Sequence, residues 1–251
     1  MRRCGLVLMV VIGLCGGAVA QGAPKFRALA FYSEKVERDH VDFAHAALKF
    51  YADAAKRDGF ELVTTMNWDD LNAENLKQYQ LVVWLDDFPA TQAQRTAFEQ
   101  YMKGGGGWLG FHIAAYNDEG TKWPWFVSFL GGGVFEGNNW PPLPATLVVE
   151  ARNHAVTKGL PESFVAPANE WYSWKPSPRA NTEVKVLLSL AASNYPLGFK
   201  DTLTGGDVPV VWTNTRYRML YLNMGHGDRI FTDAVQNKLL EQAMVWVGTK
   251  R

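Results

Sequence analysis

Three of the five histidines, His40, His112 and His226, each follow a segment that is predicted to be a strand. Imidazole can transfer protons near neutral pH and is also the commonest metal ligand. The carboxyl ends of parallel strands meet at one edge of a sheet, which is the usual position of a site in such folds. We therefore expect the three rings to converge, with their nitrogens within roughly 8 Å of one another, close enough to share a metal ion.

The expected cofactor is one divalent first-row metal ion, because such ions accept several imidazoles together with a carboxylate. No H-E-x-x-H spacing is present, so this prediction rests on ligand types alone. His40 opens a predicted helix, whose amino terminus disfavours imidazolium, so it should be neutral and able to bind metal. Asp86 and Asp87 end another predicted strand and are candidate carboxylate ligands; the alternative is that they cap a helix or are solvated.

His112 occupies the central position of the run G-F-H-I-A, residues 110–114. This run has the spacing of a nucleophile elbow, in which small residues flank a polar one at the end of a strand. A histidine in that position could be a general base, an oxyanion donor or a metal ligand. The alternative is a buried histidine that is hydrogen-bonded to the backbone.

The other two histidines are expected to lie outside this site. His45 is five residues beyond His40 on the same predicted helix, about 140° around its axis, so we expect it to be solvated. His154 lies in a predicted turn, where a local hydrogen bond is the favoured interpretation.

The first half of the chain alternates strands and helices. Hydrophobic periodicity predicts strands over residues 26–32, 60–65, 81–85 and 108–111, and helices over 40–57, 71–78 and 91–102. Thr91 and Gln94 have the spacing of a capping box. This alternation predicts an α/β fold with a doubly wound, mostly parallel sheet. The glycines of residues 104–107 lie between a helix and a strand, the reverse of a phosphate-binding loop, so they predict a tight turn.

The second half is less regular. It predicts a short helix from Trp123, a loop over 136–142, an exposed loop or short strand over 170–174, and a glycine-rich loop over 223–229. Four strands are expected over 145–151, 185–190, 208–212 and 219–222, and a closing amphipathic helix over 233–247. No linker, repeat or low-complexity segment is found, which favours one domain over residues 21–251.

The amino terminus reads as a signal peptide over residues 1–20. Arg2 and Arg3 precede an apolar run over 5–17, and Ala18-Val19-Ala20 fits the cleavage rule. The alternative is an uncleaved anchor, although the run is short for a membrane span. We expect cleavage after Ala20, a periplasmic or secreted protein, and no stable membrane span after processing. Both cysteines, Cys4 and Cys15, would be removed, leaving no disulfide and no cysteine nucleophile.

The composition favours a small-molecule ligand over nucleic acid. The formal net charge is zero and no basic run is present, so nucleic acid is not an expected partner. The chain has ten tryptophans, and several aromatic residues lie in the irregular second half, where loops often carry function. A carbohydrate could lie against Trp123, Trp140, Trp171 and Tyr172; the alternative is that about half of these aromatic residues fill the core.

Several motifs taken together resemble the trehalose-utilisation (ThuA-like) family. They are G-G-G-W-L-G-F-H-I-A-A, W-P-W-F, H-A-V-T-K-G-L-P, E-W-Y, V-P-V-V-W and N-M-G-H-G, spread over residues 26–247. That family is similar in fold to class I glutamine amidotransferases, a flavodoxin-like arrangement. The resemblance implies a role in disaccharide or glycoside breakdown, including breakdown by way of 3-keto sugars.

The resemblance also implies site residues. The family's F-R-H motif matches only Arg38 and His40, with one residue inserted, and the E-W-Y motif makes Glu170 the preferred carboxylate. The sequence departs from the family at Asn169, where an acid is common, and at Ala155, where proline is common. The expected catalytic residues are thus His112, Arg38 and Glu170, and the expected metal ligands are His40, His112 and His226.

The expected reaction is metal-assisted lyase or hydrolase chemistry on a glycoside, with Arg38 or the metal holding the developing negative charge. One alternative is a non-catalytic carbohydrate-binding protein on the same fold. A third interpretation, amide hydrolysis, is disfavoured because the mature chain would have no cysteine nucleophile.

Overall fold

The computed structural model describes residues 23–118 and 120–249. Within them a nine-stranded sheet has the order β2-β1-β3-β4-β11-β10-β9-β6-β7. Its strands are β1 (Arg27–Phe31), β2 (Glu61–Thr65), β3 (Leu81–Trp84), β4 (Gly107–Phe111), β6 (Leu143–Val149), β7 (Ser163–Asn169), β9 (Val184–Leu190), β10 (Pro209–Asn214) and β11 (Arg218–Leu222). A second sheet pairs β5 (Val134–Asn138) with β8 (Tyr172–Lys175).

The sheet has a parallel half and an antiparallel half. Strands β2, β1, β3, β4 and β11 run parallel, so their carboxyl ends share one edge. Strands β10, β9, β6 and β7 continue the sheet with antiparallel pairing. The predicted α/β fold is confirmed, and the antiparallel extension is a feature that the sequence analysis did not specify.

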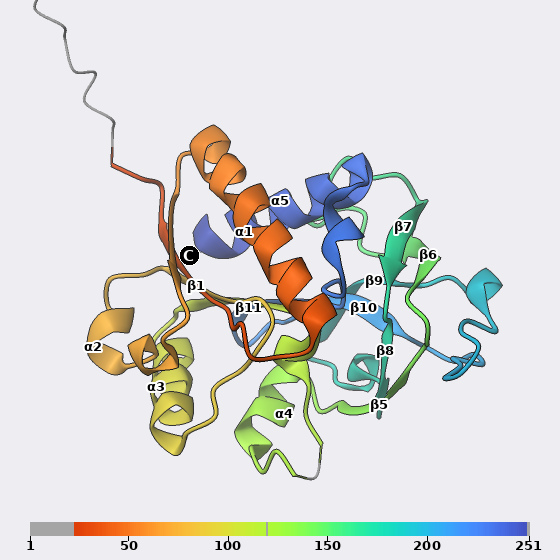
Figure 1. Cartoon of the computed structure of the whole chain (residues 1–251), viewed down its shortest axis with the longest axis horizontal. Coiled ribbons are helices and arrows are strands. Elements are labelled where there is room, and N and C mark those ends of the chain that lie inside the picture. Colours follow the sequence, from red (N-terminus) through yellow and green to blue (C-terminus); the bar gives the residue numbers. More distant parts are fainter. Residues whose placement is uncertain (1–22, 119, 250–251) are drawn as a thin grey trace, which may run out of the picture.

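Helices cover both faces of the sheet (Figure 1). The first face packs against α1 (Arg38–Asp58) and α5 (Ala234–Thr249), and the second against α3 (Gln92–Lys103) and α4 (Pro124–Leu130). A short helix, α2 (Ala73–Leu76), lies beside α3. Phe43 and Leu240 belong to the first core and Phe98 and Trp108 to the second, which is how a doubly wound sheet buries both of its faces.

Local signals in the sequence determine where these helices begin and end. Helix α1 ends at Gly59, whose φ of 73° suits glycine because a Cβ would be strained there. Helix α3 begins with the predicted capping box: the Thr91 hydroxyl accepts from the Gln94 N–H, and the Gln94 side chain accepts from the Thr91 N–H. Residues 104–107 form the expected turn into β4.

In the second half, two predictions were wrong in part and one strand was missed. Residues 136–138, part of the predicted loop over 136–142, belong to β5. Strand β7 was not predicted at all. The segment over 170–174 includes a short strand, as one of the two predicted alternatives had it. It is not exposed, because Trp171, Tyr172 and Trp174 are buried. Strand β8, which pairs with β5, carries Tyr172 and Trp174 in the second core, whereas Trp171 precedes β8 and packs in the first core. Tertiary contacts therefore decide the burial of these rings rather than local sequence pattern.

No helix within residues 23–118 and 120–249 has the length and apolar character needed to cross a membrane. The predicted signal peptide, with Cys4 and Cys15, lies outside the described residues.

Candidate active site

The structure brings the three histidines together at the carboxyl edge of the parallel half. His40 lies in the first turn of α1 after β1, His112 directly follows β4, and His226 lies in the loop after β11. Their ring centroids are 5.2 Å apart for His40 and His112, 5.1 Å for His40 and His226, and 5.6 Å for His112 and His226. Three imidazoles around one tetrahedral ion would hold their ring centres roughly 5 Å apart, which is close to this spacing. The ligand atoms that lie within 4.8 Å of one another nevertheless form two sets, one with His112 and one with His226.

His112 is held in a backbone conformation that is rare for residues other than glycine. Its φ is 43°, at the point where the chain leaves β4, and strain of this kind persists where the surroundings hold it in place. The Tyr221 hydroxyl donates to the His112 carbonyl over 3.1 Å. Gly225 allows the next loop to approach, since a Cβ at that position would lie 2.3 Å from the His112 Cβ.

The tautomer of His112 follows from its contact with Asn223. The ring Nδ1 lies 3.0 Å from the Asn223 carbonyl oxygen, which can only accept, so Nδ1 must carry the proton. Burial lowers the pKa of His112 well below its usual value, so the ring is neutral and Nε2 presents a lone pair. Nε2 has no hydrogen-bond partner within the described residues and lies 3.4 Å from Glu170 Oε2.

Glu170 is the more enclosed carboxylate of the cluster, with 14% of its side chain accessible. Its Oε2 is 3.4 Å from His112 Nε2 and 3.7 Å from His226 Nε2. Burial raises the pKa of Glu170, although His226 and hydrogen bonds from Tyr172 and Asn138 act in the opposite direction. The Asn138 amide donates to Oε1 over 2.5 Å, which fixes the carboxylate from β5. Glu170 is therefore oriented toward two of the three imidazoles.

Asn169 connects the E-W-Y segment to the loop that carries His226. Its Oδ1 accepts from the N–H groups of Gly225 and His226, both over 3.1 Å. Its Nδ2 donates to the carbonyls of Asn223 over 3.1 Å and Glu170 over 2.8 Å. A carboxylate could not make the last two bonds because it has no hydrogen to donate. Asn169, which stands where related sequences often have an acid, therefore uses both its amide hydrogens and its carbonyl oxygen in hydrogen bonds.

His40 is a second imidazole that its environment keeps neutral. Burial, followed by the neighbouring His112 and His226, lowers the pKa of His40 to about 2. Its Nε2 also lacks a hydrogen-bond partner among the described residues. The expectation that His40 would be neutral agrees with this environment, with burial rather than the helix terminus as the main cause.

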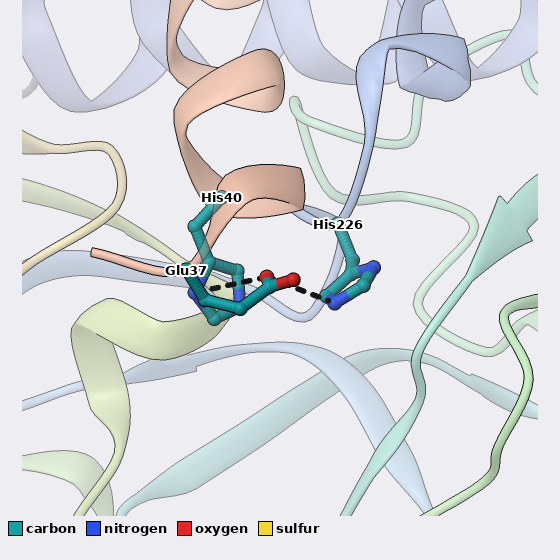
Figure 2. Close-up of side chains that lie close together, drawn as sticks. All are labelled: Glu37, His40 and His226. Carbon is teal, nitrogen blue, oxygen red and sulfur yellow. Dashed lines mark ion pairs between the residues drawn. The ribbon is translucent and has the colours of Figure 1, made fainter. Parts of the chain in front are cut away.

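Glu37 is a member of the cluster that the sequence analysis missed. Figure 2 shows its carboxylate between His40 and His226, with Oε2 3.8 Å from His40 Nδ1 and 3.4 Å from His226 Nε2. It precedes α1 and is half exposed, with 52% of its side chain accessible. The sequence did contain a signal for this residue. Glu37 lies three residues before His40, a spacing that places both side chains on one side of the first helical turn.

Two ligand triads share His40. One is Glu37, His40 and His226, and the other is His40, His112 and Glu170; within each, the candidate ligand atoms lie within 4.8 Å of one another. Asp39 adds an outer contact, with its Oδ2 3.5 Å from His226 Nδ1. A carboxylate behind a ligating imidazole is the usual way to fix the ring orientation in a metal site.

Several other candidates lie away from the cluster. The Arg38 side chain is 82% exposed and bonded to Asp42, on the outside of α1. Asp86 is buried and accepts from the Ser33 N–H, and Asp87 accepts from the Phe88 N–H. His45 is exposed and paired with Glu34, and His154 accepts from the Val156 N–H, as a turn residue should.

The four aromatic candidates differ in exposure. Trp123 and Trp171 are buried, and their indole N–H groups donate to Glu99 and to the Leu143 carbonyl. Tyr172 is also buried, with its ring centroid 3.9 Å from that of His112, so it forms a wall of the cluster. Trp140 retains 37% of its surface, with its ring centroid 6.1 Å from that of His226.

Comparison with known proteins identifies a family and several similar structures. Residues 27–247 match the ThuA family, described as trehalose utilisation. The solved structure of a protein described as ThuA-like from Bacteroides uniformis is 55% identical, with a TM-score of 0.89 over 91% of this chain and 94% of that chain. No protein with curated function matches the chain at a significant level.

More distant structures support the fold alone. A ThuA-like protein from Parabacteroides merdae is 16% identical, with a TM-score of 0.61 over 89% of this chain and 90% of that one. A protein from Thermoplasma acidophilum, described as part of a GMP synthase, is 9% identical, with a TM-score of 0.53 over 88% of this chain and 94% of that one. The fold is thus shared with glutamine amidotransferase-like proteins. Because the family model matches residues 27–247, nearly all of the described chain, the protein belongs to the ThuA, or trehalose-utilisation, family.

Proposed function

We propose that this protein is a metal-assisted enzyme that cleaves a glycoside, preferentially one already oxidised at C3, by lyase or hydrolase chemistry. The observation that carries the proposal is the pair formed by His112 Nε2 and Glu170 Oε2, two acceptor atoms 3.4 Å apart in a buried site. The family description, trehalose utilisation, supports a sugar as the substrate.

A cation would explain why two acceptors face each other. A neutral imidazole nitrogen and a carboxylate oxygen repel unless a proton or a positive ion lies close to both of them. His40, whose Nε2 also lacks a partner among the described residues, and His226 lie beside this pair, with ring centroids 5.2 Å and 5.6 Å from that of His112. We propose His40, His112 and His226 as the ligands of one divalent ion, with Glu37 approaching from the exposed side.

Glu170 is the proposed general base. A carboxylate with a raised pKa is a stronger base than an exposed one, and its proton-accepting form is present above that pKa. It removes the C2 hydrogen of a 3-keto glycoside, the C2–H electron pair forms the C1–C2 double bond, and the C1–O bond breaks. The departing oxygen keeps the bond's electron pair and takes up the proton. Addition of water to the unsaturated product would complete hydrolysis.

The ion and the aromatic residues have separate parts in this proposal. A bound divalent cation supplies positive charge that stabilises the negative charge developing on the C3 oxygen. Arg38 is not assigned this part, because its side chain is bonded to Asp42 on the outer side of α1. Trp140 offers an apolar face beside His226, against which the C–H face of a sugar ring can pack.

The test is incubation of the mature protein with trehalose and with 3-keto trehalose, with a chelator or with a series of divalent metals. The products are identified by mass spectrometry. We expect cleavage of the 3-keto sugar, loss of cleavage with the chelator and recovery with one added metal. Absence of turnover with every metal, while sugar binding persists, would contradict the enzyme proposal and support a carbohydrate-binding protein.

We also propose that the protein is exported and that its mature form begins at Gln21. The support is the basic start, apolar run and Ala-Val-Ala site in the sequence. Intact-mass measurement of protein recovered from the periplasm or medium tests this. Residues 1–20 still attached to the recovered protein would contradict cleavage.

A further inference from the structure

Two of the large apolar side chains that are exposed in the described part of the chain belong to neighbouring residues. Phe199 is 82% exposed and Trp140 is 37% exposed. The Phe199 N–H donates to the Trp140 carbonyl over 2.7 Å, although the two residues are far apart in the sequence. Apolar residues exposed singly are normal on a protein surface, whereas a contiguous apolar patch indicates a binding surface.

A short hairpin fixes the position of Phe199. Leu197 and Leu203 exchange two backbone hydrogen bonds, each 2.9 Å long, and both side chains are buried in the first core. Gly198 has a φ of 106° and makes a close turn between them, because a Cβ there would collide with the Asp201 carbonyl oxygen. The hairpin is thus a fixed segment, and it holds an apolar ring in the solvent.

The hairpin lies beside the proposed active site. The Trp140 N–H donates to the Asp201 carbonyl over 2.8 Å, and the Trp140 ring centroid is 6.1 Å from that of His226. Burial raises the pKa of Glu170, and the charge of Asp201 acts more weakly in the same direction, so the hairpin is within electrostatic reach of the proposed base. A group that extends from the reacting ring past Trp140 would therefore reach the segment that carries Phe199.

The chemistry of this patch favours an aromatic group over a hydroxyl-rich one. The Phe199 side chain has no hydrogen-bond donor or acceptor, so it offers no partner to the hydroxyls of a second sugar ring. An aromatic group buries its own apolar surface against such a ring, and two aromatic rings attract each other beyond the effect of the area that they bury. The fixed and exposed position of Phe199 therefore suits a flat apolar ligand.

We propose that Phe199 binds the leaving group of the substrate and that this leaving group is aromatic, so that the protein prefers aryl and arylalkyl glycosides. The inference rests on the proposed function and specifies its substrate class. The reacting sugar ring lies between the histidine cluster and Trp140, and the aromatic group extends from it onto Phe199. When the C1–O bond breaks, this group departs as a phenol or an alcohol, whose oxygen keeps the electron pair of the bond and takes up the proton.

The experiment compares benzyl glucoside with methyl glucoside of the same anomeric configuration. Both release an alcohol, and only the first carries an aromatic ring. Calorimetry measures the binding of each, unoxidised and in its 3-keto form, to the wild type and to Phe199→Ala. We expect the wild type to bind the benzyl compound about tenfold more tightly, and Phe199→Ala to lose most of this preference, because the contact between two aromatic rings is absent.

Two further variants are the controls. Phe199→Tyr keeps an aromatic ring and should keep the preference. Val165→Ala shortens another exposed apolar side chain, on the edge strand β7, and should leave the preference unchanged.

Three results would overturn the inference. They are a wild type that does not prefer the benzyl compound in either form, a preference that survives in Phe199→Ala, and a change in oligomeric state of Phe199→Ala with the preference retained, which would assign the ring to a contact between copies. Turnover distinguishes this inference from the proposed function. If the preference falls as expected but neither 3-keto compound is cleaved with any metal, the leaving-group site stands and the chemistry fails.

Discussion

The two halves of the sheet contribute different parts of the site. The parallel half carries His40, His112 and His226 at the ends of strands or in the first turn of a helix. The antiparallel half and the small sheet contribute Glu170 and the amides of Asn138 and Asn169. The parallel half therefore sets where the imidazoles converge, whereas the other half sets how the carboxylate is oriented.

This difference has a physical cause. Parallel strands bring their carboxyl ends to one edge regardless of the side chains that follow, so convergence there is a property of topology. The orientation of Glu170 is not set by the strand ends. It depends on particular hydrogen bonds, including the one from Asn138. Substitution of a histidine of the parallel half should therefore remove the metal site. Substitution of Glu170 or of a residue that orients it should reduce the rate of turnover and leave the metal in place.

The largest effect is expected for His112→Gln. Loss of the buried Nε2 should lower turnover of the 3-keto substrate about 1,000-fold, since several kcal/mol of charge stabilisation depends on the metal site. Steady-state kinetics measures the change, and a thermal melt establishes that the variant is folded. His45→Gln, on the exposed side of α1, is the control and should retain full activity. Equal activity of both variants would contradict the assignment.

Glu170→Gln separates the base from the ligands. We expect turnover to fall about 100-fold with metal content unchanged, because the amide keeps the shape of the side chain but cannot take up a proton. Metal analysis and kinetics on the same preparation measure both quantities. Glu162→Gln, at an exposed ion pair with Arg152, is the control. Loss of the metal together with the rate would instead make Glu170 a ligand.

Asp86 provides a contrast within the parallel half, because it lies at a strand end but outside the histidine cluster. Burial raises its pKa from 3.8 to about 8, so the folded protein favours the protonated carboxyl. Stability due to the neutral form is fully present below pH 3.8 and is lost as the pH rises toward about 8. Asp86→Asn should therefore gain stability relative to the wild type over this range, by about 2 kcal/mol or more. Urea unfolding at several pH values measures the gain, and a constant difference would contradict the raised pKa.

The smallest effect on rate is expected for Asn138→Ala, which removes one hydrogen bond to Glu170. Turnover should fall about tenfold with little change in stability, as is usual for a residue that orients a catalytic group. The adjacent Asn139 is fully buried, and its Oδ1 accepts a hydrogen bond from the backbone N–H of Trp171. Asn139→Ala should therefore mainly lower the melting temperature. If the two variants behaved alike, Asn138 would be structural rather than orienting.

The parallel half could be predicted from sequence because its signals are local. Apolar runs marked its strands, and Thr91 and Gln94 marked a helix start. The meeting of three histidines then followed from topology alone. Glu37 was missed because it lies in a loop before α1, where an acidic residue usually indicates solvation.

The second half could not be predicted to the same degree because its structure depends on distant pairing. Strand β5 contains glycine and asparagine and is followed by two prolines, so it resembled a loop, and only pairing with β8 makes it a strand. Tyr172 in β8 and Trp171 just before it are buried in the second and the first core, although the sequence suggested that both were available to sugar. The orientation of Arg38 away from the cluster depends on Asp42, one helical turn later.

The central claim is that His40, His112 and His226 bind one divalent ion. Its most direct test is metal stoichiometry, measured by elemental mass spectrometry after dialysis of the protein against micromolar zinc, manganese or nickel and then against metal-free buffer. The account predicts about one ion per chain for the wild type, and little or none for His40→Ala and His226→Ala, since loss of one of three imidazoles leaves an incomplete ligand set. A wild type that retains no ion, or histidine variants that retain as much as the wild type, would contradict it.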